Sequence, residues 1–524
     1  MTDAATMENQ LNSVSPNSPQ WSRLLKGAAW FLAIANALWA FSLIMADPDL
    51  WGHLKFGQAL VENGSLHATD PFSLTAFGHI WINHEWLTEL VFWVAYANFG
   101  DAGLLLGKLL IGLGIVVMLL KTCRDQPIIA AALVVSLAAF AAAPGFNVRP
   151  QVFSFFFYTV FIVVLREFFS GGKNLLFLLP ISTVIWVQLH GGFLMGVVVL
   201  GLAAGWATLM QLVSGKKEFS LKTLWFWTIL TFAAPMINPY GYKLLLFFSQ
   251  TLSVPRAISE WEPLPLMDFS HWQAKLLMVM FFAAVCLKPE KIRKWEAVVV
   301  FFTVYASLKH VRHLPFFAIT VAPWLVDWIG EAVAEFKEKR PQTVMTLPTI
   351  GIIAAAFIVV GAVQCYKTVD LYRAAKLRIV VDQDFYPVHA VRYMKANNLT
   401  GGLILPFDWG EFAMWHLYPN MLVSIDGRFR TCYPEQVIQD HMRAFSLPWQ
   451  EWRRLDKYKG DVLLTPNTKF FQELAAINKG WKIIHADSTA ILFLRDNEYN
   501  QPVLARFRGP GFVKPDLTDI QFFP

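Results

Sequence analysis

Apolar segments recur along almost the whole of this 524-residue chain and are separated by short polar linkers. A membrane-spanning helix needs about 20 predominantly apolar residues, with a range of about 17–25. Charged residues make up 16% of the chain, compared with about 25% in soluble domains. The pattern therefore predicts a polytopic α-helical membrane protein with about 11 spans, several of them short enough to be tilted or broken. The apolar runs lie near 27–45, 103–120, 127–143, 152–168, 175–189, 192–213, 222–237, 274–288, 296–308, 314–330 and 347–364.

Composition and motif spacing narrow the protein class further. Residues 1–25 are polar and rich in Ser and Asn, so we expect a disordered cytoplasmic N-terminus there. The run 27–45 is too long for a signal-peptide core and reads as a retained anchor. The four cysteines are scattered, which argues against a disulfide framework or a structural zinc site. The net charge of +6 comes from short basic runs between apolar segments, so we expect no nucleic-acid partner.

The distribution of basic residues predicts the topology. If residues 86–99 lie flat as an amphipathic helix in the membrane interface, nearly all basic linkers fall on one side. The positive-inside rule places that side in the cytoplasm, whereas counting 86–99 as a span would put most of these charges outside. The basic linkers contain Arg23, Lys26, Lys121, Arg124, Arg166, Lys173, Lys216, Lys217, Lys222, Lys288, Lys291, Arg293, Lys294, Lys337, Lys339 and Arg340.

The same topology sends the conspicuous polar motifs to the opposite, external face. We expect a transmembrane domain over 26–366, whose first external loop spans 46–102. From about residue 380 the pattern changes to a helix over 387–398 and short β-rich runs at 403–405, 421–425, 462–464 and 490–494. An odd number of spans places this soluble α/β domain, 380–524, outside. The other external motifs lie at 147–151, 188–192, 238–241, 259–261 and 309–313.

The first external loop carries the candidate catalytic residues. Asp47 and Asp49 flank a proline that favours extended backbone, so both carboxylates could face one ligand and bind Mg²⁺ or Mn²⁺, or one could act as a general base. Alternatively, Asp49 only caps a helix over 50–63 and Asp47 is a solvated loop residue. Asp70, His84 and Glu85 lie on the same loop, where Asp70 could simply form a turn and Glu85 could cap the next helix.

Cationic side chains gather at the predicted external ends of other helices. Together they could hold a phosphate or diphosphate carried on a lipid, because Arg and Lys pair with phosphate oxygens. The alternative is that single residues reach toward lipid headgroups. Glu260 could pair with one of these cations. The set consists of Arg149, His190, Lys309, His310, Arg312 and His313.

Two motifs in the expected external domain also combine carboxylates with distinctive neighbours. Residues 407–411 (FDWGE) place aromatic rings beside carboxylates, as sugar-binding surfaces do. Residues 424–428 (SIDGR) contain an Asp-Gly pair, which is equally a turn signal. Both motifs can therefore be structural or can contact a sugar.

The arrangement resembles the C-type (GT-C fold) membrane glycosyltransferases, and more closely a bacterial group of GT-C-like membrane proteins. The matching segments are DPDLWGHLKFG, TDPFS, NHEWL, RPQ, LHGGF, NPYG, SEW, RHLPFF, FDWGEF and SIDGR, spread over about 47–430. One departure is Gly52, where a second Trp would be expected after Trp51. Another is the Asp47-Pro48-Asp49 spacing, which replaces an adjacent acidic pair and leaves open which Asp matches the catalytic one.

The resemblance implies transfer of a hexosyl or pentosyl group from a polyprenyl-phosphate or polyprenyl-diphosphate donor to a glycan, lipid or protein acceptor. The reaction would take place at the external face of a bacterial inner membrane. Asp47 or Asp49 would deprotonate the acceptor or hold a metal ion, and the cationic set would stabilise the departing lipid phosphate. An oligosaccharide polymerase or ligase, or a non-enzymatic transporter or scaffold for envelope polysaccharide, are the alternatives.

Overall fold

The chain forms two compact units in a computed structural model that describes residues 19–215, 219–252, 259–290, 294–340, 345–446, 451–477, 480–507 and 511–524. Unit 1 contains Met1–Leu43, Leu106–Gly241 and Ser253–Ala374. Unit 2 contains Ile44–Leu105, Tyr242–Leu252 and Ala375–Pro524. The tail predicted to be disordered falls largely outside the described residues, and the first described helix begins at Pro19.

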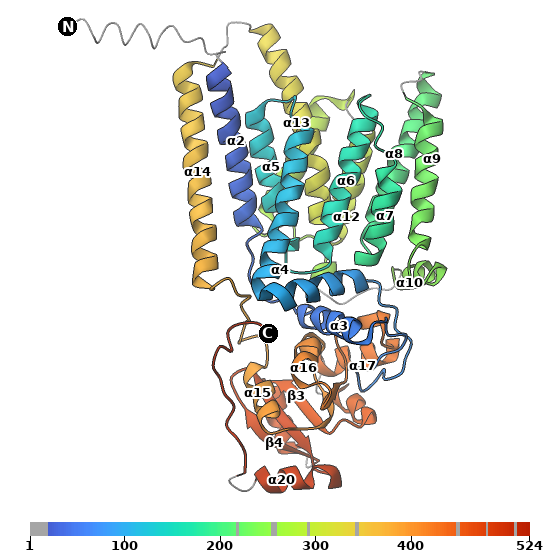
Figure 1. Cartoon of the computed structure of the whole chain (residues 1–524), viewed down its shortest axis with the longest axis vertical. Helices are drawn as coiled ribbons and strands as arrows, with labels where there is room; N and C mark the ends of the chain where they lie inside the picture. The colour runs from blue at the N-terminus through green and yellow to red at the C-terminus, as the bar shows by residue number, and fades with distance from the viewer. Residues whose placement is uncertain are drawn as a thin grey trace, which may run out of the picture. The chain divides into compact units, whose positions relative to one another are not determined.

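Unit 1 is a bundle of helices, and each predicted apolar run between 103 and 364 corresponds to a helix in the structure (Figure 1). Six of the described helices are long and apolar enough to cross a membrane, among them Phe193–Ser214 and Leu347–Ala374. The prediction of a polytopic membrane protein is therefore confirmed. The helices of unit 1 are α2 (Pro19–Ala40), the second part of α4 (Trp86–Thr122), α5 (Ile128–Ala142), α6 (Gln151–Phe169), α7 (Leu178–Leu189), α8 (Phe193–Ser214), α9 (Leu221–Ala233), α11 (Trp272–Leu287), α12 (Trp295–Lys309), α13 (Leu314–Lys339) and α14 (Leu347–Ala374).

Small residues and a few polar contacts hold the bundle together. Helix α5 is rich in alanine and packs against α2 and α13, because small side chains let helix backbones approach closely. Tyr158 Oη lies 2.6 Å from Thr320 Oγ1 and joins α6 to α13. Arg166 of α6 forms ion pairs with Glu296 of α12 and Asp327 of α13. These ion pairs compensate charges that would be costly to bury alone.

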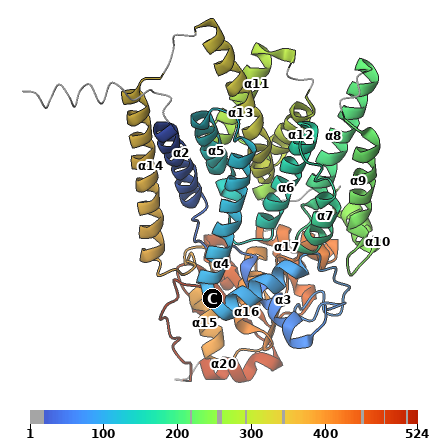
Figure 2. The same ribbon diagram turned by 45° about the horizontal axis from the view of Figure 1, so that its top comes forward.

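Helix α4 is interrupted at Gly100, which separates the predicted interfacial segment from the predicted span. Its backbone has φ 59° and ψ −152°, a non-helical conformation inside an otherwise helical stretch of 37 residues (Figure 2). Glycine adopts this region at little cost, whereas other residues do not. The break at Gly100 agrees with a division of α4 into two helical segments. The location of residues 86–99 in the membrane interface stays a prediction.

Unit 2 is built around a five-stranded mixed sheet with strand order β2-β1-β3-β5-β4. Strand β1 pairs in parallel with β2 and β3, and β5 pairs antiparallel with β3 and β4. The four predicted strands and the helix predicted over 387–398 are present, but β4 was missed. The strands are β1 (Gly401–Ile404), β2 (Met421–Val423), β3 (Val462–Pro466), β4 (Trp481–Ala486) and β5 (Ala490–Arg495). The helices are α3 (Leu50–Asn63), α10 (Tyr242–Leu252), α15 (Val388–Ala396), α16 (Gly410–Leu417), α17 (Glu435–Ser446), α19 (Lys469–Ile477) and α20 (Gln501–Phe507).

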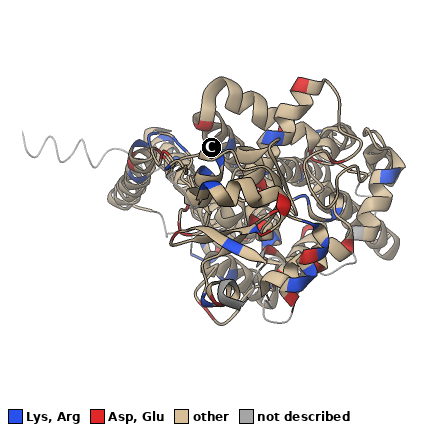
Figure 3. Ribbon diagram, turned by 90° about the horizontal axis from the view of Figure 1, so that it is seen from below, with Lys and Arg blue, Asp and Glu red and all other residues tan. Residues whose placement is uncertain are grey.

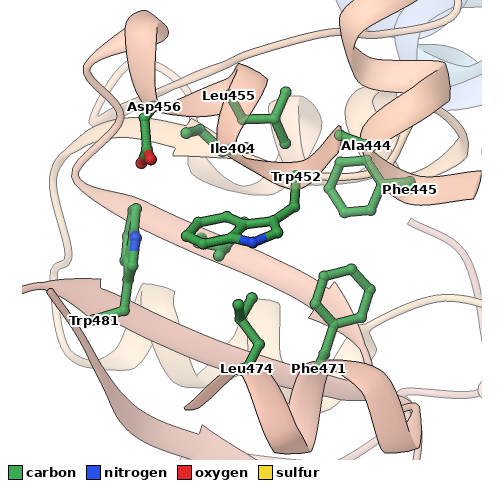
Figure 4. Close-up of a pocket in the computed structure, with 10 residues that line it drawn as sticks. Ile404, Ala444, Phe445, Trp452, Leu455, Asp456, Phe471, Leu474 and Trp481 are labelled. Carbon is green, nitrogen blue, oxygen red and sulfur yellow. The ribbon is translucent and has the colours of Figure 1, made fainter. Parts of the chain in front are cut away.

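One face of the sheet packs into an aromatic core. Trp452 lies among aliphatic and aromatic side chains of β1, α17 and α19, with Trp481 of β4 at its edge (Figure 4). The remaining cavity is about 10 Å³, which is about the space of one water molecule. This part of unit 2 is therefore a filled core. Figure 3 marks the positions of Lys, Arg, Asp and Glu along the ribbon of the described residues, seen from below.

The first loop packs with the C-terminal residues, so the structure divides the chain differently from the predicted domains. Backbone hydrogen bonds join Leu74 N to Val423 O at 2.8 Å and Ile82 N to Thr431 O at 3.2 Å. Thr75 Oγ1 donates to Ser424 O at 2.6 Å. Residues 44–105 therefore belong to the same compact unit as 375–524, although the sequence pattern grouped them with the transmembrane domain.

Candidate functional site

Asp47 and Asp49 lie on a tight turn, and the predicted extended backbone between them is wrong. Asp47 Oδ1 accepts a hydrogen bond from Asp49 N at 3.1 Å, and Asp47 O accepts from Leu50 N at 3.0 Å. Asp49 has φ −84° and ψ −8° and stands at the N-cap of α3 without a side-chain capping bond. The Asp47 side chain thus closes a local turn, as Asp side chains often do, and leaves Asp49 to point elsewhere.

Asp49 points toward a buried glutamate of the C-terminal region. A methyl group placed on Gly427 would lie 2.6 Å from Glu411 Oε1 and closer still to Asp49 Oδ1, so both carboxyl groups converge on this glycine. Glu411 is only 4% exposed, and its Oε2 accepts a hydrogen bond from Gly52 N at 3.0 Å. A side chain at Gly52 would overlap the Glu411 carboxyl group. The departure at Gly52 thus makes room for Glu411.

Burial and nearby like charges raise the pKa values of two acidic side chains around Asp49. Burial raises the pKa of Glu411 well above its ordinary value, and the charges of Asp49 and Asp426 raise it further. Burial likewise raises the pKa of Asp408, with Asp49 as the second cause. Glu411 and Asp408 therefore keep their protons to a higher pH than exposed carboxyl groups do.

Asp70 belongs to a buried ion cluster with Arg428. Arg428 Nη1 donates to Asp70 Oδ1 at 2.6 Å, while its Nε and Nη2 donate to Asp426 at 2.9 and 2.7 Å. The guanidinium also lies over the rings of Phe56 and Trp81, at 4.9 and 4.8 Å from their centroids. Asp70 accepts further bonds from the turn that it begins. These contacts favour a structural role for Asp70, which ties the first loop to the SIDGR motif.

His84 and Glu85 lie in a second polar group of the first loop. His84 Nε2 is 3.6 Å from Glu85 Oε1, and the His84 ring contacts Phe248 of α10. His53 Nδ1 lies 3.8 Å from Glu89 Oε1. Burial lowers the pKa of His53, but the contact with Glu89 and other nearby carboxylates outweighs burial and leaves the pKa raised. His53 of α3 and Glu89 therefore form a buried contact pair, in which burial also raises the pKa of Glu89.

Arg149 and the predicted cationic residues 309–313 come together within unit 1, whereas His190 contacts Ser154 of α6. Arg149 forms an ion pair with Glu260, which is the kind of pairing considered for Glu260. Backbone bonds from Val311 N to Glu262 O and from Leu264 N to Leu308 O, both 3.1 Å, tie the segment after Glu260 to the end of α12. The Arg312 guanidinium lies 4.6 Å from the Trp261 ring centroid. Arg149, Arg312 and Lys309 are thus presented by one connected loop region.

Hydrogen bonds determine which ring nitrogen of each histidine carries the proton. His310 Nδ1 lies 2.5 Å from Trp261 O, and His313 Nδ1 lies 3.0 Å from Ala306 O. A carbonyl oxygen only accepts, so these Nδ1 atoms donate. His190 is the reverse, because Gly192 N donates to its Nδ1 at 3.0 Å. The neutral His190 ring therefore carries its proton on Nε2, whereas His310 and His313 have Nε2 atoms that can accept.

Several residues of this arrangement were not predicted as site residues. Glu411 and Arg428 were noted only as parts of the FDWGE and SIDGR motifs, and the aromatic–carboxylate signal there was the only hint. Among the described residues, no group of three or more His, Cys, Asp or Glu side chains is arranged to hold a metal ion. Asp47 and Asp49 thus do not form a complete metal site with the side chains as they stand. The structure groups the predicted residues into an acidic set in unit 2 and a cationic set in unit 1.

Comparison with known proteins identifies the fold. No protein-family model matches the sequence, and no curated protein matches it. Among solved structures, the chain is similar to the oligosaccharyltransferase AglB from Archaeoglobus fulgidus in complex with an inhibitory peptide and a dolichol-phosphate. The identity is 12%, the match covers 86% of this chain and 69% of that chain, and the TM-score is 0.56.

Two further solved structures are similar to this chain. The Archaeoglobus fulgidus oligosaccharyltransferase tethered to an acceptor peptide matches at 11% identity over 86% of this chain and 69% of that chain, with a TM-score of 0.55. ArnT from Cupriavidus metallidurans bound to undecaprenyl phosphate matches at 12% identity over 88% and 97%, with a TM-score of 0.43. The oligosaccharyltransferase likeness shows that this integral membrane protein has the GT-C fold, as the sequence resemblance predicted.

Proposed function

We propose that this protein is a membrane glycosyltransferase that moves a sugar from a polyprenyl-phosphate-type lipid to an acceptor at the external membrane face. The observation that supports the proposal most is the GT-C fold, matched to an oligosaccharyltransferase over 86% of the chain. That enzyme was solved with a dolichol-phosphate and an inhibitory peptide. In the proposed reaction, a lipid phosphate corresponds to the donor side and a peptide is one kind of acceptor.

Asp49 is the residue that we assign as the general base. The Asp47 side chain is 5% exposed and hydrogen-bonded within its own turn, whereas Asp49 is half-buried and points toward Gly427. In the proposed step, the Asp49 carboxylate accepts the proton of an acceptor hydroxyl group. The hydroxyl oxygen then bonds to the anomeric carbon while the bond from that carbon to the phosphate oxygen breaks.

The cationic set would stabilise the lipid phosphate as it departs. Negative charge grows on the phosphate oxygens as the bond breaks, so fixed cations lower the energy of the transition state. Arg149 and Arg312 are held in place by Glu260 and Trp261. Lys309 supplies a further cation and the Nε2–H group of His190 a hydrogen-bond donor, whereas His310 and His313 would donate to a phosphate oxygen through Nε2 only as protonated rings. The proposal therefore assigns the acceptor to the acidic set and the lipid phosphate to the cationic set.

A divalent cation is a part of the proposal that needs its own test. The Archaeoglobus enzyme has also been solved in complex with zinc and sulfate. Here Asp47 and Asp49 are the carboxylates that would contribute to a metal site, but the described side chains do not complete one. No step above therefore depends on a metal ion, and addition of a chelator to the transfer assay measures the requirement directly.

The experiment uses bacterial membranes containing the full chain, incubated with radiolabelled polyprenyl-phosphate-linked glucose, mannose and arabinose. We expect transfer of label from at least one donor to a product that no longer partitions with the polyprenyl lipid. Asp49→Asn should lower the rate by about 10²–10⁴-fold, the usual contribution of a general base. Asp47→Asn should cause a smaller loss, because it keeps a side chain that can accept the turn hydrogen bond.

The matched control is Glu62→Gln, which removes an exposed carboxylate from the same helix α3. It should transfer label at the wild-type rate. An Asp49→Asn protein that inserts normally and transfers at the wild-type rate would remove Asp49 from the reaction. Equal labelling with and without the chain, for all three donors, would contradict the proposed function. The length of the labelled product distinguishes transfer of a single sugar from polymerase or ligase activity.

A further inference from the structure

Unit 2 contains a cationic pocket that plays no part in the proposed sugar transfer. Its cavity is about 260 Å³, slightly below the range of about 300–1,000 Å³ typical of pockets for drug-sized molecules. It is therefore large enough for a small headgroup and too small for a lipid-linked sugar. Its lining residues are Arg378, Arg392, Lys395, Trp415, His416, Asp519, Phe522 and Pro524.

Two of the three cations in this pocket have no direct counterion among the described residues. Arg392 and Lys395 lie three residues apart on α15, so they share one face of that helix. Neither side chain makes a hydrogen bond or ion pair with any residue in the described parts of the chain. The nearby carboxylates are Asp519 in the pocket wall, Asp101 beside Arg378 and the exposed Asp516, which lies within electrostatic range of Arg392.

Arg378 is the third cation of the pocket. Its close contacts are a backbone carbonyl group and an aromatic ring, and its two carboxylate neighbours lie farther away. Arg378 Nη2 donates to Phe523 O at 2.7 Å, and its guanidinium lies 4.7 Å from the Phe522 ring centroid. Its distances to Asp101 and Asp519 are 3.7 and 3.8 Å, longer than a good charge-assisted hydrogen bond. Burial and the charges of Lys395 and Arg392 lower the pKa of His416 to about 3. The His416 side chain is therefore uncharged and lines the pocket beside the three cations.

Chain connectivity brings the pocket close to the membrane surface. Helix α14 has 28 residues, which span about 42 Å, close to the 40–45 Å of a bilayer with its headgroups. Arg378 follows the end of α14 at Ala374 by four residues, which reach at most about 14 Å. Trp415 of the pocket also contacts Trp93 and Tyr96, at 6.4 and 6.3 Å between ring centroids. Trp and Tyr clusters of this kind are typical of the headgroup level.

We propose that this pocket binds a phosphate group, presented by the headgroup of an anionic membrane lipid. Three cations around a headgroup-sized cavity, beside an aromatic cluster and within a few residues of a membrane helix end, match the chemistry of such headgroups. The site anchors unit 2 to the membrane surface. It lies wholly within unit 2, shares no residue with the acidic or cationic set, and does not depend on the proposed glycosyl transfer.

The experiment measures lipid retained by the purified full chain. The protein is exchanged into nanodiscs of phosphatidylcholine with 10% phosphatidylglycerol, a probe composition chosen because one lipid is anionic and the other is not, and bound lipid is quantified by native mass spectrometry. The double variant Arg392→Gln/Lys395→Gln should retain phosphatidylglycerol about 30-fold more weakly, since each basic residue near an anionic headgroup contributes roughly a factor of five. Phosphatidylcholine retention should not change.

Controls separate the pocket from general surface charge and from a soluble ligand. Arg443→Gln/Lys469→Gln removes two exposed cations of unit 2 outside the pocket and should retain lipid as the wild type does. Millimolar inorganic phosphate should leave retention unchanged. Displacement by phosphate in the wild type alone would reassign the source to a free anion. Equal phosphatidylglycerol retention by the wild type and the pocket variant, or an equal loss in the control variant, would overturn the proposal.

Discussion

At the scale of single residues, Arg428 holds together the two sequence regions of unit 2. Its partners Asp70 and Asp426 lie on the first loop and after β2, and the Arg428–Asp70 contact joins residues 358 positions apart. A buried charge is tolerated only when its partners surround it, and removal of one partner of a buried pair costs about 3–5 kcal/mol. Replacement of Arg428 should therefore lower the free energy of unfolding more than replacement of an exposed arginine does.

We predict that Arg428→Met destabilises unit 2 by about 3–5 kcal/mol, because two buried carboxylates lose their counterion. Thermal unfolding of the purified protein, followed by intrinsic fluorescence, measures the change. Arg443→Met, at an exposed position of α17, should leave the melting temperature nearly unchanged. Adding Asp70→Asn and Asp426→Asn to Arg428→Met should recover part of the loss, and no recovery would mean that the charges are not its cause.

Glu411 gives a prediction for pH dependence. Its folded-state pKa is raised by burial and by the charges of Asp49 and Asp426, so the folded state binds its proton more tightly than the unfolded state does. The resulting stability is fully present below the unfolded pKa of about 4.5 and is lost as the pH rises toward the folded pKa. Glu411→Gln keeps the shape of the side chain and removes this titration.

The stability difference between wild type and Glu411→Gln should therefore change with pH. The stability of Glu411→Gln relative to that of the wild type should increase as the pH is raised from about 5 to 8. The melting temperatures of both proteins across this pH range measure the change. Glu435→Gln offers a contrast, because the bond from Arg430 lowers the pKa of Glu435. A constant difference between wild type and Glu411→Gln would show that Glu411 is already ionised in the folded protein.

At the scale of helices and strands, the sequence predicted those elements that are determined by a local pattern of residues. Apolar runs predicted the helices of unit 1, and the pattern after Asp49 predicted a helix over 50–63, which is α3. The turn at 47–49 was missed because Pro48 also suits the second position of a turn, and Asp49 N donates to the Asp47 side chain within it. Strand β4, with the short segment WKIIHA, lies at the end of the strand order and has a weak hydrophobic signal.

The backbone conformation at Gly100 in helix α4 gives a prediction about the free energy of unfolding. Gly100→Ala should destabilise the protein by about 1–3 kcal/mol, because φ 59° and ψ −152° are essentially restricted to glycine. Gly107→Ala, later in the same helix, meets nothing within 4 Å and should be neutral or stabilising by up to about 1 kcal/mol. Thermal unfolding of the two variants in parallel checks the break, and equal effects would show that it is not required.

At the scale of the whole molecule, the acidic set could not be predicted from the sequence. Glu411 contacts Gly52 across 359 positions, and no local pattern indicates which distant carboxylate meets Asp49. The fold was predictable from motifs spread along the chain, because each motif resembles a segment of a known group. The pairing of these motifs in space depends on long-range packing, and only the structure reveals it.

The orientation of the chain in the membrane is the last prediction, and it comes from charge alone. The positive-inside rule places the basic helix ends in the cytoplasm and residues 380–524 outside. A variant without the four native cysteines would receive a single new cysteine, either Lys469→Cys in unit 2 or Lys337→Cys near the end of α13. Lys469 is 90% exposed, and Lys337 is exposed at the C-terminal end of its helix.

We expect a membrane-impermeant maleimide to label Lys469→Cys in intact spheroplasts, and to label Lys337→Cys only after lysis. Both variants should react fully once the membrane is opened, which confirms that each cysteine is accessible. The reverse pattern would place unit 2 in the cytoplasm. It would also move the acidic set, and with it the proposed transfer reaction, to the opposite face of the membrane, because Asp49 and residues 380–524 share one compact unit.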